Sequence, residues 1–238
     1  MNILAIGNSF SEDATRYLHD IARADGERLE VTNLYIGGCS LEHHYRNMLS
    51  DQRAYELQYN GQKTGFPVSL SDALLNREWD VITLQQVSHL SFNFESYKPY
   101  ITELYCYVKK FAPNAKIYLH QTWAYEKNSA RLHDIAKYES ADVMLRDIAI
   151  AYSNAAELIC ADGIIPSGEL FAKLIKSGIQ PMYRDTFHAS LGIGRFALST
   201  LWYHTITKRP TIGITIGTLN EPVSESALCT VKSIVDTF

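Results

Sequence analysis

The sequence predicts an α/β fold in which a central, mostly parallel β-sheet is covered by helices on both faces. Short apolar runs alternate along the chain with longer segments of helical periodicity, the pattern of repeated strand–helix–strand units. The chain has 238 residues, of which 46% are hydrophobic and 20% are charged. This size and composition suit one large globular domain, and we take residues 1–238 as a single domain.

The expected strands are short, aliphatic and bounded by turn residues. About five are expected in the parallel sheet: residues 3–6, 29–36, 81–84, 117–120 and 158–160. Residues 51–69 differ, because Asn60-Gly61 is a strong hairpin signal between two stretches that favour extended structure. We therefore expect a small β-hairpin insertion at 51–69.

The expected helices carry apolar residues at helical spacing and end near glycine or proline. Gly26 follows the first of them, and Pro113 and Pro210 follow two later ones. The expected helices are residues 14–24, 41–49, 71–77, 97–111, 141–156, 168–176 and 192–207. The C-terminal tail, residues 220–238, is expected to add one more helix near 224–235.

The composition argues against two kinds of partner. The net charge is −4 and no basic stripe is present, so nucleic acid is not expected to bind. No apolar run approaches the roughly 18–20 residues of a membrane span, so no membrane partner is expected. The N-terminus carries no basic region or cleavage site, which predicts a cytoplasmic protein unless a signal has been removed. The oligomeric state is left open.

Several polar and glycine residues directly follow the expected strands. They are Ser9, Gly37-Gly38, Gln85-Gln86 and Gln121 to Trp123. Parallel strands connected by right-handed crossovers end along one edge of the sheet, and ligands bind at that edge in such folds. We therefore expect these residues to gather along one rim.

Ser9 lies where the first strand turns into a helix. A serine hydroxyl needs a base within hydrogen-bond reach to act as a nucleophile. Gly7 allows a tight turn, and the N–H groups at the start of the helix would face an oxyanion formed near Ser9. The alternative is that Ser9 or Ser11 merely caps the helix.

The segment RDTFHAS, residues 184–190, supplies a candidate base. Asp185 and His188 are three residues apart, so on one turn the carboxylate would lie beside the imidazole. A carboxylate on Nδ1–H fixes the tautomer and leaves Nε2 free to accept a serine proton. The alternative is an aspartate that caps the next helix, with a histidine packed beside it.

Three short motifs together resemble the GDSL/SGNH hydrolases. They are IGNSFSEDA near the N-terminus, NLYIGGCS at 33–40 and DTFH at 185–188. The resemblance implies a flavodoxin-like three-layer α/β/α sandwich, with Ser9 as nucleophile, His188 as base and Asp185 as its orienting carboxylate. It also implies that the oxyanion is held by the N–H groups of Ser9 and Gly38 and by an asparagine side chain.

The chain departs from this family at the third oxyanion donor. The family's Gly-x-Asn-Asp block is missing, and DVITLQQVSH stands in its place. A glutamine amide offers the same donor as asparagine on a longer arm, so Gln86, or less favourably Gln85, could replace it. Both glutamines could instead simply hydrogen-bond to neighbouring backbone. Asn8 stands where the family has aspartate.

The resemblance implies a serine esterase for small esters, and acetyl groups on carbohydrate are the first expectation. Gln121, Trp123 and Tyr125 are candidate substrate-binding residues, although core packing explains the aromatic pair equally well. No cofactor and no metal is expected, because adjacent histidines such as His43-His44 point about 100° apart on a helix. The alternative is a flavodoxin-like domain that binds a ligand or glycan without turnover; G-x-G-x-x-G and P-loop motifs are absent.

Overall fold

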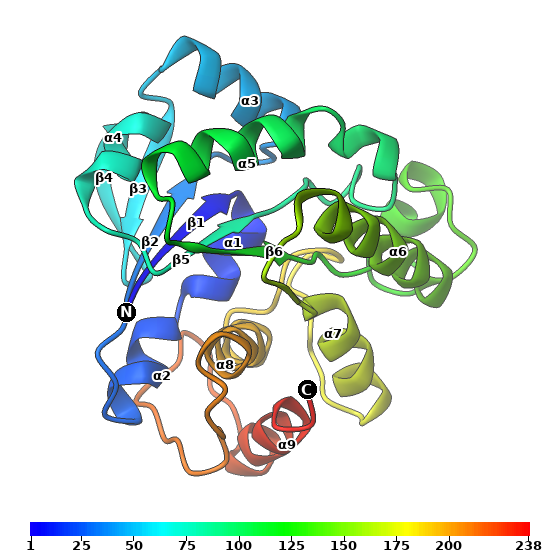
Figure 1. The fold of residues 1–238 in the computed structure, drawn as a ribbon. Helices are drawn as coiled ribbons and strands as arrows, with labels where there is room; N and C mark the ends of the chain where they lie inside the picture. Colours follow the sequence, from blue (N-terminus) through cyan, green and yellow to red (C-terminus); the bar gives the residue numbers. More distant parts are fainter.

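The computed structural model describes all residues, 1–238, and contains one seven-stranded sheet in the order β4-β3-β2-β1-β5-β6-β7. Five neighbouring strands run parallel, as expected. These are β2 (Glu30–Tyr35), β1 (Asn2–Gly7), β5 (Val81–Leu84), β6 (Lys116–His120) and β7 (Gly163–Ile165). The sheet lies between two layers of helices, which confirms the three-layer prediction (Figure 1).

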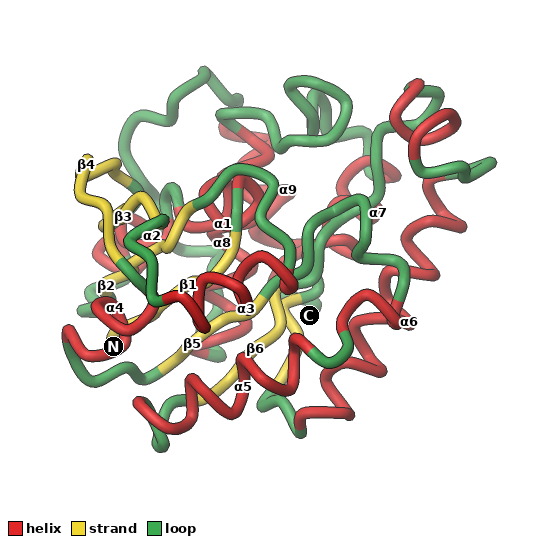
Figure 2. Tube along the Cα trace, turned by 90° about the horizontal axis from the view of Figure 1, so that it is seen from above, coloured by secondary structure: helices red, strands yellow, loops and turns green.

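One helical layer lies above the sheet in Figure 1 and the other below it. The upper layer consists of α3 (Leu41–Ser50), α4 (Leu70–Asn76), α5 (Tyr100–Phe111) and α6 (Ala141–Ile159). The lower layer consists of α1 (Ser9–Thr15), α2 (Leu18–Ala24), α7 (Ser167–Lys176), α8 (Ile193–Thr207) and α9 (Glu225–Val235). Figure 2 looks down on the upper layer, with the strands beneath it.

Alternation along β1 assigns its side chains to two separate cores. Ile3 and Ala5 pack into the core beneath the sheet, and Leu4 and Ile6 pack into the core above it. The two cores contain 30 and 29 buried residues, so both faces of the sheet are covered to a similar extent. This explains why β1 is apolar from Ile3 to Ile6 instead of alternating with polar residues.

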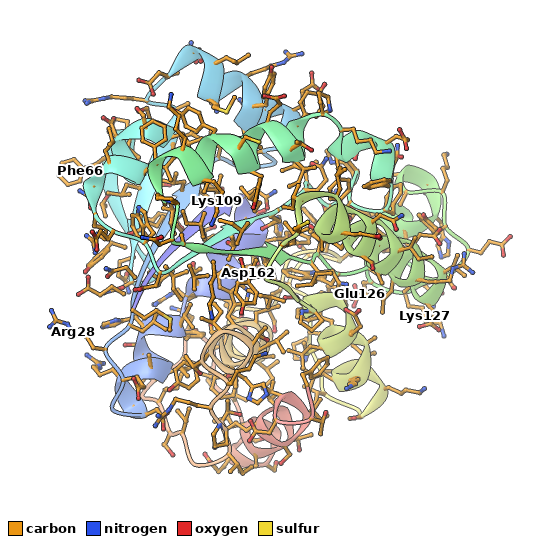
Figure 3. All side chains as sticks on the ribbon, viewed as in Figure 1. Arg28, Phe66, Lys109, Glu126, Lys127 and Asp162 are labelled. Atoms are coloured by element: carbon orange, nitrogen blue, oxygen red, sulfur yellow. The ribbon has the colours of Figure 1, made fainter.

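The expected hairpin is present and extends the central sheet. Its strands are β3 (Tyr55–Tyr59) and β4 (Gln62–Val68), and β3 pairs antiparallel with β2. At the turn, Asn60 and Gly61 both have positive φ, at 50° and 74°. A Cβ on Gly61 would lie 2.2 Å from the carbonyl oxygen of Arg16, so only glycine fits. Phe66 on β4 projects into solvent at the outer edge (Figure 3).

Two sequence-based predictions were wrong in detail. The helix expected at 14–24 is two helices, α1 and α2, and the first begins at Ser9 itself. The strand expected at 158–160 belongs to the end of α6, where Ile159 continues the buried stripe and Cys160 ends the helix at φ 51°. The fifth parallel strand is instead the three-residue β7. No helix combines the length and apolar character needed to cross a membrane.

Two histidines are buried in the folded protein without a charged partner. His44 packs on Tyr55, and His120 packs edge-on against Trp202. Burial, with a contribution from His43, lowers the pKa of His44 to about 3, and burial lowers the pKa of His120 to about 3. Both side chains are therefore neutral in the folded state down to strongly acidic pH.

We expect the protein to lose stability as the pH falls below about 6.5. In that range the unfolded chain protonates both histidines and the folded protein does not, so acid favours unfolding. Each histidine should lower the free energy of unfolding by about 1 kcal/mol between pH 7 and 5.5. Urea unfolding at these two pH values measures the loss, and His120→Asn should roughly halve it. An equal stability at both values would contradict the assignment.

Candidate active site

Ser9 is the first residue of α1 and follows directly on β1. The cap of this helix is Asn8, whose Oδ1 accepts a hydrogen bond from the N–H of Phe10 at 3.0 Å. The Ser11 hydroxyl donates to the Asn8 carbonyl at 2.8 Å and also lies 2.7 Å from Oδ1 of Asn33. Neither serine is the cap, and the Ser9 hydroxyl is free to interact elsewhere.

The structure brings Ser9 together with His188 and Asp185. The Ser9 Oγ lies 2.8 Å from Nε2 of His188, across 179 residues of sequence. Nδ1 of His188 lies 2.7 Å from Oδ2 of Asp185, and the His188 backbone N–H donates to Oδ1 at 2.8 Å. Since a carboxylate only accepts, Nδ1 carries the proton and Nε2 has its lone pair directed at the serine hydroxyl.

Asp185 is held as a carboxylate. Partial burial of the Asp185 carboxyl opposes ionisation, but hydrogen bonds from the side chain and backbone of His188 outweigh it and lower the pKa of Asp185. Its side chain is 45% exposed and that of His188 is 18% exposed, so the pair opens to solvent on one side. The imidazole is therefore partly accessible to solvent.

Asp13 connects the loop that contains Asp185 and His188 to α1, the helix that begins at Ser9. This carboxylate lies one turn beyond Ser9 on α1 and is completely buried. Nη1 of Arg184 lies 2.9 Å from both of its oxygens, and Nε of Arg195 lies 2.8 Å from Oδ1. The backbone N–H of Ala189 donates to Oδ2 at 3.2 Å. The residues on either side of Asp185 and His188 are thus bonded to the same carboxylate.

Asp13 was not among the site residues predicted from the sequence. Its position four residues after Ser9, together with the two arginines around the histidine segment, was the available signal. Burial raises the pKa of Asp13, and the guanidinium groups of Arg195 and Arg184 oppose that rise. A buried carboxylate with two cationic partners indicates a structural role in positioning the site.

Trp123 lies in the core beneath the site and does not form a substrate wall, which corrects the prediction. It is fully buried and stacks on Phe10 with the ring centres 4.0 Å apart. Its Nε1–H donates a hydrogen bond to the carbonyl of Phe187 at 2.7 Å. The Phe187 ring in turn lies 3.8 Å from the imidazole of His188. Trp123 therefore supports the loop next to His188 from below.

Tyr125 and Gln121 are also buried, and the prediction that they bind substrate is not supported. The Tyr125 hydroxyl is 3.0 Å from the Ser88 hydroxyl. The Gln121 side chain accepts from the N–H of Gly168 and donates to Glu169. Both side chains hold neighbouring loops in place, and their polar groups are used within the protein.

Gln86 is not an oxyanion donor in this structure. Its amide nitrogen donates to the carbonyl and hydroxyl oxygens of Ser96, at 3.0 and 3.1 Å. Its oxygen accepts from the N–H groups of Leu41 and Val87. Gln86 is 1% exposed, so both amide hydrogens are committed and it fixes the start of α3. The sequence had left open the alternative that Gln85 and Gln86 hydrogen-bond to neighbouring backbone, and the contacts of Gln86 agree with that alternative.

Gln85 belongs to a buried chain of amides that organises the turn at Ser9. Its nitrogen donates to Oδ1 of Asn8 at 2.7 Å, and its oxygen accepts from Nδ1 of His120 at 3.0 Å. Asn8 then donates from Nδ2 to the carbonyl of Cys39 at 3.0 Å. Asn8 thus joins the ends of β1, β2 and β5 at one point, beneath Ser9.

Gly38 is the remaining candidate donor from the second motif. It is exposed, has φ of 65° and precedes the carbonyl that Asn8 holds. Its N–H donates to no backbone acceptor. The N–H of Ser9 lies at the first position of α1, where a helix leaves its donors unsatisfied. Ser9 and Gly38 therefore each offer a backbone N–H, and the bond from Asn8 to the Cys39 carbonyl ties the Gly38 loop to the turn at Ser9.

We expect Asn8→Ala to lower the free energy of unfolding by about 1–3 kcal/mol, because the helix loses its cap and the Cys39 carbonyl loses its donor. Asn8→Ser keeps a capping oxygen but cannot reach Cys39, so it should recover about 1 kcal/mol of that loss. Urea unfolding of the two variants measures both values. Equal stability of Asn8→Ser and Asn8→Ala would show that the cap contributes nothing.

No group of three histidine, cysteine, aspartate or glutamate side chains is placed to hold a metal ion. His43 is exposed on α3 and His44 points into the core, as expected for neighbours on a helix. The two do not face a common site.

The parallel three-layer sheet, with Ser9, His188 and Asp185 at its carboxyl edge, defines an α/β protein of the fold found in GDSL-like lipases and esterases. Comparison of families is more specific. The model of a family described as a domain of unknown function, DUF4886, matches residues 2–218, and the chain belongs to this family. A search of curated proteins gave no match.

Solved structures agree with this assignment. A DUF4886 family protein from Bacteroides uniformis is 32% identical with a TM-score of 0.91, over 100% of this chain and 93% of that one. A putative GDSL-like lipase from Parabacteroides merdae is 16% identical, with a TM-score of 0.53 over 87% and 96% of the chains. The acetylxylan esterase Axe2 from Geobacillus stearothermophilus is 15% identical, with a TM-score of 0.52 over 90% and 94%. The latter two share the fold.

Proposed function

We propose that this protein is a serine esterase that hydrolyses small acyl esters, with O-acetyl groups on carbohydrate as the preferred substrates. The observation that carries the proposal is the 2.8 Å contact between the Ser9 hydroxyl and Nε2 of His188, whose Nδ1–H is held by Asp185. A hydroxyl, a base and an orienting carboxylate in this order are the requirements for nucleophilic acyl transfer.

In the first half of the reaction, the Ser9 oxygen bonds to the ester carbonyl carbon as its proton passes to Nε2 of His188. The carbonyl oxygen becomes an oxyanion against the N–H groups of Ser9 and Gly38. The bond to the alcohol oxygen then breaks, and His188 gives its proton to that oxygen. Asp185 stays ionised throughout and stabilises the imidazolium.

In the second half, water attacks the acyl-serine carbon and gives a proton to His188. The tetrahedral intermediate collapses, the Ser9 oxygen leaves and takes the proton back, and the carboxylic acid departs. Two backbone N–H donors serve both halves. The side-chain donor found in related hydrolases has no counterpart in Gln86, because both hydrogens of its amide are bonded to Ser96.

The preference for acetyl groups on carbohydrate is supported by the fold shared with an acetylxylan esterase. We test it with acetylated xylo-oligosaccharides against 4-nitrophenyl esters of two to eight carbons, with Ser9→Ala and His188→Ala in parallel. Release of acetate from the saccharides, lost in both variants, is expected. Hydrolysis of long-chain esters alone would overturn the substrate class, and binding of saccharides with no Ser9-dependent turnover would favour a non-catalytic domain.

A further inference from the structure

One cation beside the candidate active site has no anionic partner. Arg131 begins a five-residue π-helical turn, Arg131–Ile135, in the segment between β6 and α6. Its guanidinium carbon lies 3.7 Å from the centre of the Phe187 ring. No carboxylate oxygen lies within 4.0 Å of its nitrogens, although Glu126 and Asp134 belong to the same segment and Asp185 to the next loop. Figure 3 shows Glu126 beside Lys127 near α6.

The Phe187 ring separates Arg131 from His188. A group less than 4 Å from a ring centre must lie over a face of the ring, and the imidazole of His188 is 3.8 Å from the same centre. Two groups cannot occupy one face, so the guanidinium and the imidazole lie on opposite faces. Only the Phe187 ring therefore lies between the unpaired Arg131 and His188, the group that would protonate the leaving alcohol.

A second group near this cation is His89, which is exposed. It follows β5, and neither of its ring nitrogens has a hydrogen-bond partner in the protein. Partial burial, and secondarily the positive charge of Arg131, lower the pKa of His89. An anion bound by Arg131 would gain the two parallel donors of its guanidinium, and its charge would also act on the nearby His89.

We propose that Arg131 binds a negatively charged group on the alcohol part of the substrate, so that the preferred esters are those of acidic alcohols such as acetylated uronic acids. This inference rests on the proposed esterase function. His188 must lie beside the leaving oxygen to protonate it, and the oxyanion donors lie at Ser9 and Gly38. The alcohol part then extends past His188 and Phe187, towards Arg131.

The test compares two acetate esters of similar size that differ in charge, 4-acetoxybenzoate and 4-acetoxybenzamide. We expect the ratio of kcat/KM for the anionic ester to that for the neutral one to fall about tenfold in Arg131→Gln, and less in Arg131→Lys. The control is Arg28→Gln, which removes a cation just before β2, at the amino ends of the parallel strands and away from the candidate site (Figure 3). This substitution should leave the ratio unchanged. An unchanged ratio in Arg131→Gln would overturn the proposal, whether both esters keep their kcat/KM or both lose it equally.

A second measurement separates this inference from the esterase function itself. In Ser9→Ala, titration with 4-hydroxybenzoate is followed through the ring signals of His89 in NMR spectra, and 4-hydroxybenzamide is the neutral control. A shift caused only by the anion, and abolished by Arg131→Gln, supports the anion site. If the shift occurs but neither ester is hydrolysed by the unmodified protein, the anion site stands and the esterase proposal fails. With no shift, the anion site is rejected.

Discussion

Ser9→Ala is expected to lower kcat for small acetate esters by about 10⁴–10⁶, with the protein still folded. The hydroxyl is the only group within hydrogen-bond reach of Nε2 of His188. Without it the imidazole has no nucleophile to activate, and hydrolysis is left to water held by the two backbone donors. Initial rates with 4-nitrophenyl acetate, corrected for hydrolysis in buffer, measure the effect.

His188→Ala should cost nearly as much as Ser9→Ala, and the double variant little more, because the two residues act as one unit. Ser11→Ala is the matched control, since its hydroxyl bonds to Asn8 and Asn33 and not to His188. A loss in kcat of less than about tenfold in Ser9→Ala would reject Ser9 as the nucleophile, as would independent, multiplicative losses in the two single variants.

Asp13→Ala is expected to lower the free energy of unfolding by about 3–5 kcal/mol, the largest stability effect we predict for one side chain. The substitution leaves Arg184 and Arg195 without the buried carboxylate that both now contact. It also releases Ala189, so the loop with Asp185 and His188 loses its tie to α1. Urea unfolding gives the stability, and kcat/KM in the absence of urea should fall as well.

The control is Asp20→Ala, which removes the partner of Arg23 in a pair whose side chains are 38% and 74% exposed. An exposed pair of this kind contributes about 0–1 kcal/mol. If Asp13→Ala costs no more than Asp20→Ala, the buried carboxylate does not fasten the loop. If stability falls and kcat/KM does not, Asp13 supports the fold without positioning His188.

The parts of the fold that local patterns specify could be predicted from the sequence. Apolar runs identified four of the five parallel strands, and Asn60-Gly61 identified the hairpin. The error at 158–160 arose because a short apolar run in the last turn of a helix has no periodicity of its own. The break between α1 and α2 was missed because apolar residues keep their helical spacing on both sides of Arg16 and Tyr17, the two residues that separate the helices.

The candidate site was predictable only where the proposed chemistry restricts the residue types. Short local motifs identified Ser9, Asp185 and His188, because the residues of each motif lie close together in the sequence. The roles of Gln86 and Trp123 depend on Ser96 and Phe187, partners that no local pattern reveals. Asp13 was missed for the same reason, since a carboxylate in a short helix usually faces solvent, and only the fold buries it between two arginines.

The central claim is that the Ser9 hydroxyl is a nucleophile activated by His188, and the most direct measurement is covalent labelling with a fluorophosphonate. After reaction and proteolysis, mass spectrometry should locate a single adduct on the peptide containing Ser9. The adduct should be absent in Ser9→Ala and strongly reduced in His188→Ala. No adduct on the folded protein, or an adduct on another residue that persists in Ser9→Ala, would contradict the claim.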